Sequence, residues 1–112
     1  MSDWVPPSDL DSECLELCKA MNAMPGIRTI EACCGHGERS FKVWFLASAL
    51  DALPPLLYWF DACHSGVVGW SVQALTDCGM SPVRFLAEGP VGGYEGARLI
   101  AVQLAEWIER AA

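Results

Sequence analysis

Basic residues are scarce in this chain, and long apolar runs are absent from it. Seven Lys and Arg stand against fourteen Asp and Glu, which gives a formal net charge of -7. Because the phosphates of nucleic acids attract the opposite balance, we expect no general nucleic-acid binding. Apolar runs such as Val43 to Leu50 are far shorter than the roughly 20 residues that span a bilayer, so we expect no membrane partner.

Two further signals are missing. The first residues, 1–11, are acidic and contain prolines, unlike an export signal with its basic start and apolar middle, so we expect a cytoplasmic protein. No CxxC pair is present, which disfavours the commonest zinc motifs. The six cysteines stand in a chain with five tryptophans and four phenylalanines, whereas disulfide scaffolds are short of such core residues. We therefore expect reduced thiols.

The residues that are present suffice for one domain. With 112 residues, 53% of them hydrophobic, the chain can bury a core of its own. We find no repeat, linker or low-complexity tract, and we expect a single domain over residues 1–112. Residues 1–8 are expected to form an extended N-terminal arm whose Trp4 docks on the domain or on a partner subunit.

Periodic patterns predict helices and strands in the order αββαββα. The first helix is expected to be capped by Ser8 or Asp9 and to end at Pro25-Gly26. The other expected elements are strands at 27–34 and 40–47 joined by the loop CGHGER, a helix from about Pro54 or Pro55 to His64, strands at 67–76 and 83–88 around the turn DCGMSP, and a last helix after Gly89 to Gly93. Together they predict an α+β fold with a four-stranded mixed sheet and helices mainly on one face.

The second helix should return the chain to the end of the sheet at which it started. Strands two and three then run in one direction, and strands one and four in the other. The loops at 34–39 and 89–93 therefore emerge at the same end. The last helix begins there with unpaired backbone N–H groups, which favours an anion, although EGPVGGYEG matches neither a dinucleotide fingerprint nor a P-loop.

Mostly polar residues alternate along the strands and predict one face that helices leave open. They are Thr29, Glu31, Cys33, Lys42, Trp44, Ser71, Gln73, Arg84 and Glu88. This face would be solvated, would bind a ligand, or would pair its charges across a subunit contact. A homodimer is thus one expected partner.

Three interpretations compete for the stretch IEACCGHGERS at 30–40. As a metal site it would offer zinc Cys33, Cys34 and His36, with Cys14 and Cys18 one helical turn apart to complete the set. Adjacent strand residues point to opposite faces, so the first two cysteines reach one ion only if the strand ends between them. We expect no cofactor, with zinc as the alternative.

The second interpretation is catalytic, and the third is structural. A catalytic site would use Cys34 as nucleophile and His36 as base, with Glu88 as the orienting group if the two loops meet. A tight turn would use Gly35 and Gly37 for positive φ angles, while the histidine caps backbone groups and the cysteines are buried.

Two resemblances follow from these motifs. MNAMPGIRTIEACCGHGERSFKVWF and VRFLAEGPVGGYEGA resemble a group of small, functionally uncharacterised bacterial and bacteriophage proteins with a CCGHG loop and an EGP turn, over about Cys14 to Ala97. This resemblance implies a fold and no established activity. The chain is also distantly similar to the wybutosine-synthesising tRNA methyltransferase family, whose strand-end motif Ser-Cys-Ser-Gly-Arg falls here on Ala32 to His36. Both serines and the arginine are replaced, so it implies only a fold and the location of a site.

The leading hypothesis is a small-ligand or effector binding module with its site at the CCGHG loop. The expected ligand contacts are Cys33, Arg39, Glu88, Gly93 and Tyr94. The ligand would be a small anionic or polar molecule that contacts the arginine and His36. The alternatives are a thiol-dependent transferase or hydrolase, and a homo-oligomeric assembly or regulatory protein without catalytic activity.

Overall fold

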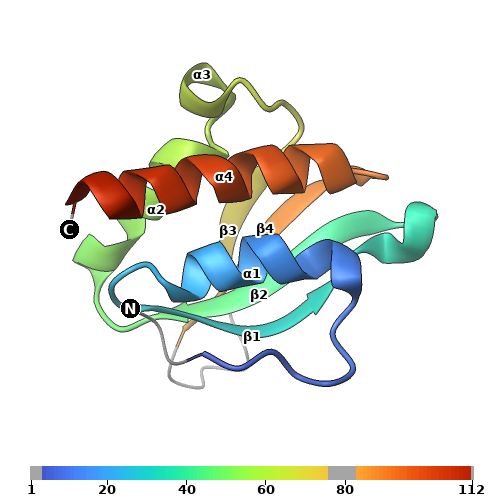
Figure 1. Cartoon of the computed structure of the whole chain (residues 1–112), viewed down its shortest axis with the longest axis horizontal. Coiled ribbons are helices and arrows are strands. Elements are labelled where there is room, and N and C mark those ends of the chain that lie inside the picture. The colour runs from blue at the N-terminus through green and yellow to red at the C-terminus, as the bar shows by residue number, and fades with distance from the viewer. Residues whose placement is uncertain (1–3, 76–82, 112) are drawn as a thin grey trace.

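The computed structural model describes residues 4–75 and 83–111, and it confirms the α+β class (Figure 1). Its elements are η1 Ser12–Cys14, α1 Leu15–Asn22, β1 Ile27–Cys33, η2 Gly35–Gly37, β2 Ser40–Ala47, η3 Leu50–Ala52, α2 Leu53–Phe60, α3 Ala62–Ser65, β3 Ser71–Leu75, β4 Arg84–Val91 and α4 Tyr94–Ala111. The predicted turn DCGMSP lies outside the described residues. Within the described ranges, the helices are too short or too polar to cross a bilayer.

The strands form one sheet in the order β1-β2-β4-β3. As expected, β1 and β4 run in one direction and β2 and β3 in the other. The mixed sheet that we predicted from these directions is wrong. Because β4 lies between β2 and β3, every neighbouring pair of strands is antiparallel.

The first helix starts later than its apolar spacing predicts. Residues 4–11 form no helix, and neither Ser8 nor Asp9 caps one, because a turn closed by the Leu10 N–H and the Pro7 carbonyl (3.2 Å) occupies this region. The half-buried side chains of Trp4 and Leu10 pack against the core. The arm is therefore longer than predicted, and it runs below β1, on the side away from α4 (Figure 1).

The fourth strand extends through the residues that were predicted to turn. Phe41 pairs with Gly89, and Ser40 pairs with Val91, so Pro90 is an extra residue in a bulge. A Cβ atom on Gly89 would lie 2.4 Å from the ring of Trp70. This glycine is therefore needed for close packing rather than for a turn.

One face of the sheet carries the core. Phe41, Val43 and Phe45 of β2 are fully buried there. They share one cluster with residues of the helices: Leu17, Cys18, Met21, Leu56, Phe60, Ile100 and Leu104. Figure 1 shows α1 and α4 side by side over the sheet, and both helices begin at the end where β1 and β4 finish.

The other face carries most of the residues predicted for it, and Thr29 is the exception. The pairing of β1 with β2 is irregular between Thr29 and Glu31. The irregularity turns Thr29 toward the helices, where its backbone N–H donates to the side-chain carbonyl of Asn22 (2.9 Å). Glu31 and Cys33 then face the same side as Lys42.

Candidate functional site

Two segments that are distant in the sequence meet at the end of the sheet where β1 and β4 finish. Cys33 pairs with Lys42, and Lys42 pairs with Glu88, so β2 alone separates the two strand ends. A Cβ atom on Gly37 would lie 3.8 Å from the Tyr94 hydroxyl. The loop after β1 and the first residue of α4 are therefore in contact.

The CCGHG loop is a tight left-handed turn. Gly35, His36 and Gly37 have φ angles of 81°, 54° and 79°. Gly35 could not carry a side chain, since its Cβ would lie 2.8 Å from the carbonyl oxygen of Ser40. The expected positive φ angles of the two glycines are confirmed, whereas the sequence did not indicate that of His36, which costs about 1–2 kcal/mol for a residue with a Cβ.

Backbone N–H groups of this turn point at both sulfur atoms. The N–H of Gly35 donates to Cys33 Sγ, and the N–H of His36 donates to Cys34 Sγ, each at 3.4 Å. Cys33 is half-buried at the end of β1, and Cys34 is buried. The turn therefore fixes two sulfur atoms on different sides of the strand end.

Asp11 is a member of the site that sequence reasoning missed. Its Oδ2 accepts a hydrogen bond from the Cys34 N–H (3.1 Å) and lies 3.7 Å from Nε2 of His36. The Cys34 N–H holds the pKa of the Asp11 carboxyl below its usual range, so this carboxylate is ionised at neutral pH. Asp11 is 23 positions away from Cys34 in the sequence. The one feature of the sequence that could have indicated its role was its place among the acidic residues that precede the first helix.

The Cys34 thiol is protonated at neutral pH. Burial raises its pKa, and the charges of Asp11 and Glu13 raise it further, against an opposing bond from the His36 N–H. Nδ1 of His36 lies 3.7 Å from the sulfur. Burial also raises the pKa of Tyr94, whose hydroxyl interacts with the Cys34 side chain and the Gly37 backbone.

Three of the predicted ligand contacts have other partners or lie at the surface. Glu88 accepts a hydrogen bond from the Ser40 hydroxyl (2.5 Å) and lies 3.9 Å from the Lys42 ammonium, so its oxygen is engaged there. The Gly93 N–H donates to the Pro90 carbonyl (3.0 Å). The Arg39 side chain is exposed.

The other two predicted metal ligands lie in the core. Cys14 and Cys18 are buried. Burial raises the pKa of both thiols, that of Cys18 to about 11. Within the described residues, the group that brings metal-binding atoms together consists of Asp11, Cys33 and His36, whose ligand atoms lie within 4.8 Å of one another.

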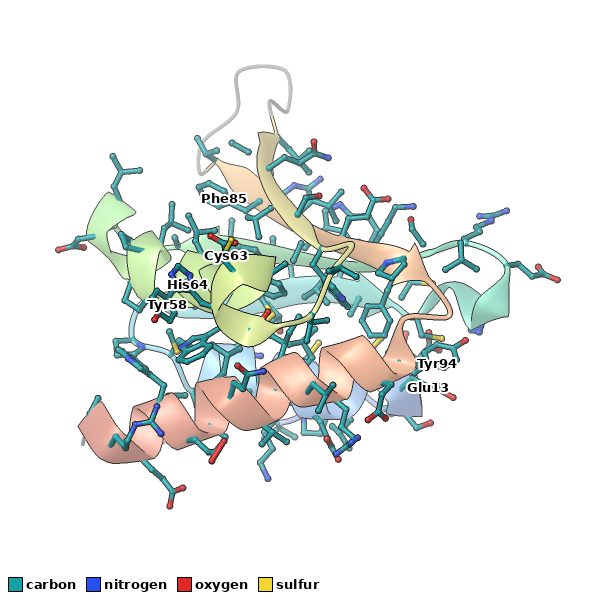
Figure 2. The ribbon with its side chains drawn as sticks, turned by 90° about the horizontal axis from the view of Figure 1, so that it is seen from above. Glu13, Tyr58, Cys63, His64, Phe85 and Tyr94 are labelled. Carbon is teal, nitrogen blue, oxygen red and sulfur yellow. The ribbon has the colours of Figure 1, made fainter. Side chains whose placement is uncertain are left out.

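An acidic hollow adjoins Tyr94. It measures about 240 Å³ and is lined by Ser12, Glu13, Glu16, Leu17, Tyr94, Glu95 and Arg98. Figure 2 shows Glu13 and Tyr94 next to each other at the start of α4. The guanidinium of Arg98 is bound to Glu95 (2.6 Å), so it leaves the hollow with a negative balance.

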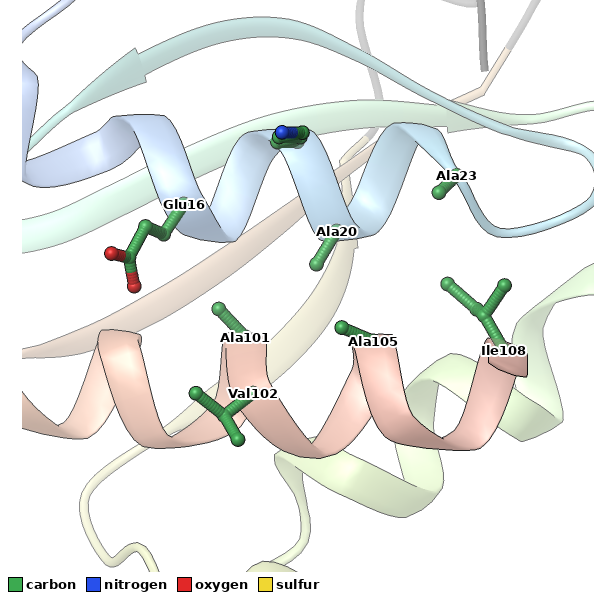
Figure 3. Close-up of a pocket in the computed structure, with 8 residues that line it drawn as sticks. Glu16, Ala20, Ala23, Ala101, Val102, Ala105 and Ile108 are labelled. Carbon is green, nitrogen blue, oxygen red and sulfur yellow. The ribbon is translucent and has the colours of Figure 1, made fainter. Parts of the chain in front are cut away.

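A larger groove runs between α1 and α4, and it lacks comparable chemistry. It measures about 350 Å³ and is lined mainly by the short side chains of Ala20, Ala23, Ala101 and Ala105 (Figure 3). Alanine lets two helices approach closely but leaves the space between them unfilled. We therefore place the candidate site at the loop.

Comparisons with known proteins do not assign the chain to a family. No family model, curated protein or solved structure matches the chain. The two resemblances drawn from the motifs stay predictions, and the function is argued from the site itself.

Proposed function

We propose that the protein is a small-ligand binding module whose site lies between the CCGHG loop and the start of α4. The observation that carries this proposal is the contact of Tyr94 with Cys34 and Gly37, which brings two glycine-rich segments together. The acidic hollow beside this contact, and a histidine held at a positive φ angle next to it, support the same location.

The charges around the site favour a polar ligand with positive charge. Asp11, Glu13 and Glu95 lie at the starts of η1 and α4, where the positive ends of the helices attract anions. These carboxylates already supply the negative charge that we expected from a ligand. An anionic ligand would have to compete with these carboxylates for the helix ends. We therefore propose a cationic or neutral polar ligand in place of the anionic one that the sequence suggested.

A thermal-shift screen tests this proposal, with polar and cationic compounds of metabolite size. Tyr94→Phe removes the hydroxyl but keeps the ring, and His36→Asn keeps a side chain that tolerates the left-handed backbone. We expect a ligand to raise the melting temperature of the wild type and to lose this effect in both variants. The control is His64→Ala, because His64 lies on α3, away from Tyr94 (Figure 2). A compound that shifts all variants equally would contradict the proposed site.

A thiol-dependent enzyme is the second candidate. The 3.7 Å separation between Cys34 Sγ and His36 Nδ1 favours it. Burial of the sulfur and the nearby Asp11 carboxylate oppose it, because both disfavour the thiolate. The binding module is therefore the better supported function.

The cytoplasm is the location that fits this proposal. The five cysteines of the described residues are free thiols, as is usual in a reducing compartment.

A further inference from the structure

We infer that Asp11, Cys33 and His36 bind one Zn²⁺ ion. The three side chains supply oxygen, sulfur and nitrogen, the set of atoms that zinc accepts in proteins. This inference deepens the proposed function, because it assigns a ligand to the same site. It differs from the metal set that the sequence suggested, since Asp11 enters and Cys34, Cys14 and Cys18 do not.

The spacing of the ligand atoms is close to what a zinc ion requires. Zinc–ligand bonds of about 2.0–2.3 Å in a tetrahedron place ligand atoms about 3.3–3.8 Å apart. Asp11 Oδ2 and His36 Nε2 are already 3.7 Å apart. All three ligand atoms lie within 4.8 Å of one another, so a movement of about 1 Å completes the site.

The imidazole of His36 is the ligand group that can move to complete the site. The His36 side chain is 68% exposed, so its ring can rotate toward the other ligands. Cys33 is half-buried at the last position of β1. Asp11 is the fixed point of the three, because its side chain is 24% exposed and is held by the Cys34 N–H.

Hydrogen bonds around the ligands prepare them for a metal ion. The Gly35 N–H donates to Cys33 Sγ (3.4 Å) and thereby orients this sulfur atom. The Cys34 N–H orients the Asp11 carboxylate in the manner of an outer-sphere partner. Binding of zinc displaces the thiol proton of Cys33, which passes to solvent.

Three protein ligands leave the fourth position of a tetrahedral zinc ion open. Zinc sites that act on a substrate have this pattern, with water or the substrate in the fourth position. The exposure of His36 leaves the ion accessible to solvent. Water, or an uncharged donor atom of the small ligand, would then occupy the fourth position.

The test titrates the full-length, metal-free protein with Zn²⁺ and with Co²⁺, whose spectrum reports its ligands. All samples carry Cys78→Ser, because that cysteine lies outside the described residues. We expect one ion per chain, with a thiolate-to-cobalt charge-transfer band and the strong visible bands of tetrahedral cobalt. Cys33→Ser should abolish the charge-transfer band. Asp11→Asn and His36→Gln each remove a direct ligand, so each should weaken Zn²⁺ binding by at least the roughly 100-fold that loss of an outer-sphere partner can cost.

The chain offers a matched control in Asp61, Cys63 and His64. These residues have the same side chains as Asp11, Cys33 and His36. In the described part of the chain, however, their ligand atoms do not all lie within 4.8 Å of one another. Cys63→Ser and His64→Gln should bind Zn²⁺ as the wild type does. Absence of binding in the wild type, or a charge-transfer band that survives Cys33→Ser, would overturn the inference.

The zinc titration and the thermal-shift screen can succeed or fail independently of each other. If zinc does not bind but Tyr94→Phe still removes the thermal shift of an organic ligand, the binding module stands without the metal. If zinc binds as described and no organic ligand is found, the metal site stands alone.

Discussion

The backbone at residue 36 takes a conformation that disfavours any side chain with a Cβ. Among the described residues, His36 alone combines a positive φ angle with a side chain. A glycine would relieve the strain, and the two flanking positions are glycines. Strain that is retained at one residue points to a role for its side chain.

Replacing His36 by glycine should therefore stabilise the fold relative to replacing it by alanine. Both variants lack the imidazole, so their comparison isolates the steric cost of the Cβ. Because glycine also gains entropy in the unfolded chain, we expect a difference of about 0.5–1 kcal/mol in favour of glycine. Urea unfolding measures it. Equal stabilities would show that the positive φ angle carries no strain.

Cys18 should make the protein less stable at high pH. Burial raises its pKa from 9.0 to about 11 in the folded state, although an interaction with Thr29 lowers it in part. The unfolded chain then loses this proton first, so the stabilisation is present below pH 9 and is lost as pH rises toward 11.

Urea unfolding at about pH 8 and about pH 10.5 should reveal a loss of up to about 2 kcal/mol from this thiol. Cys18→Ala should lose less stability than the wild type between the two conditions. A variant with the same pH dependence as the wild type would contradict the assignment.

At the scale of elements, one side chain joins the end of α1 to β1. The Nδ2 of Asn22 donates to the Cys18 carbonyl (2.7 Å) and to the Thr29 hydroxyl (2.6 Å), and its carbonyl accepts from the Thr29 N–H (2.9 Å). Thr29 faces this side because of the irregularity in β1. The junction therefore fixes the register of the helix over the sheet.

Asn22→Ala should reduce the free energy of unfolding by about 2–3 kcal/mol, because it leaves part-buried backbone groups without partners. Chemical denaturation measures the change. Gln103→Ala is the control, since Gln103 also bonds two carbonyl groups, Ser65 (3.0 Å) and Leu99 (3.3 Å), but accepts no bond from a backbone N–H, and its bond to Leu99 is exposed. It should cost less than about 1 kcal/mol. Equal losses in both variants would refute a special role for the junction.

Gly89 in β4 should tolerate no side chain. Its Cβ would meet the Trp70 ring at 2.4 Å, and Gly89→Ala should therefore reduce the free energy of unfolding by about 3 kcal/mol through overpacking.

Gly96 in α4 provides the comparison. A Cβ atom there would meet Val67 Cγ1 at 2.9 Å, but alanine also stabilises a helix by about 1 kcal/mol relative to glycine. We expect Gly96→Ala to change stability by less than about 1 kcal/mol. Thermal unfolding of the two variants compares them, and a harmless Gly89→Ala would refute the packing argument.

At the scale of the whole molecule, local sequence patterns predicted most of the helices and strands. They did not predict how strands that are distant in the sequence pair with each other. The hairpin of β1 and β2 was predictable because alternation and the glycine loop are contiguous in sequence. The position of β4 beside β2 was not, since it depends on packing between residues about half the chain apart. Asp11 was missed for the same reason: its carboxylate acts on a loop 23 residues away.

A homodimer through the open face of the sheet remains a prediction for the whole molecule. Lys42 and Glu88 lie on this face, beside the half-buried Trp44. Light scattering coupled to size exclusion should give twice the 12.2 kDa chain mass at high concentration, and Trp44→Glu should lower it. A mass of one chain at all concentrations would contradict the dimer.

The strand order also has a consequence for the folding pathway. Each hairpin, β1 with β2 and β3 with β4, pairs strands that are consecutive in the chain, whereas pairing of β2 with β4 must wait until the two hairpins dock. The bond between Ser40 and Glu88 and the contact of Tyr94 with Gly37 both cross this seam. The contact between the loop and Tyr94 therefore forms only at the docking step, and transient undocking of the hairpins would release a small ligand held between them. The metal ligands Asp11, Cys33 and His36 all come before β2 in the chain, so a bound ion would stay.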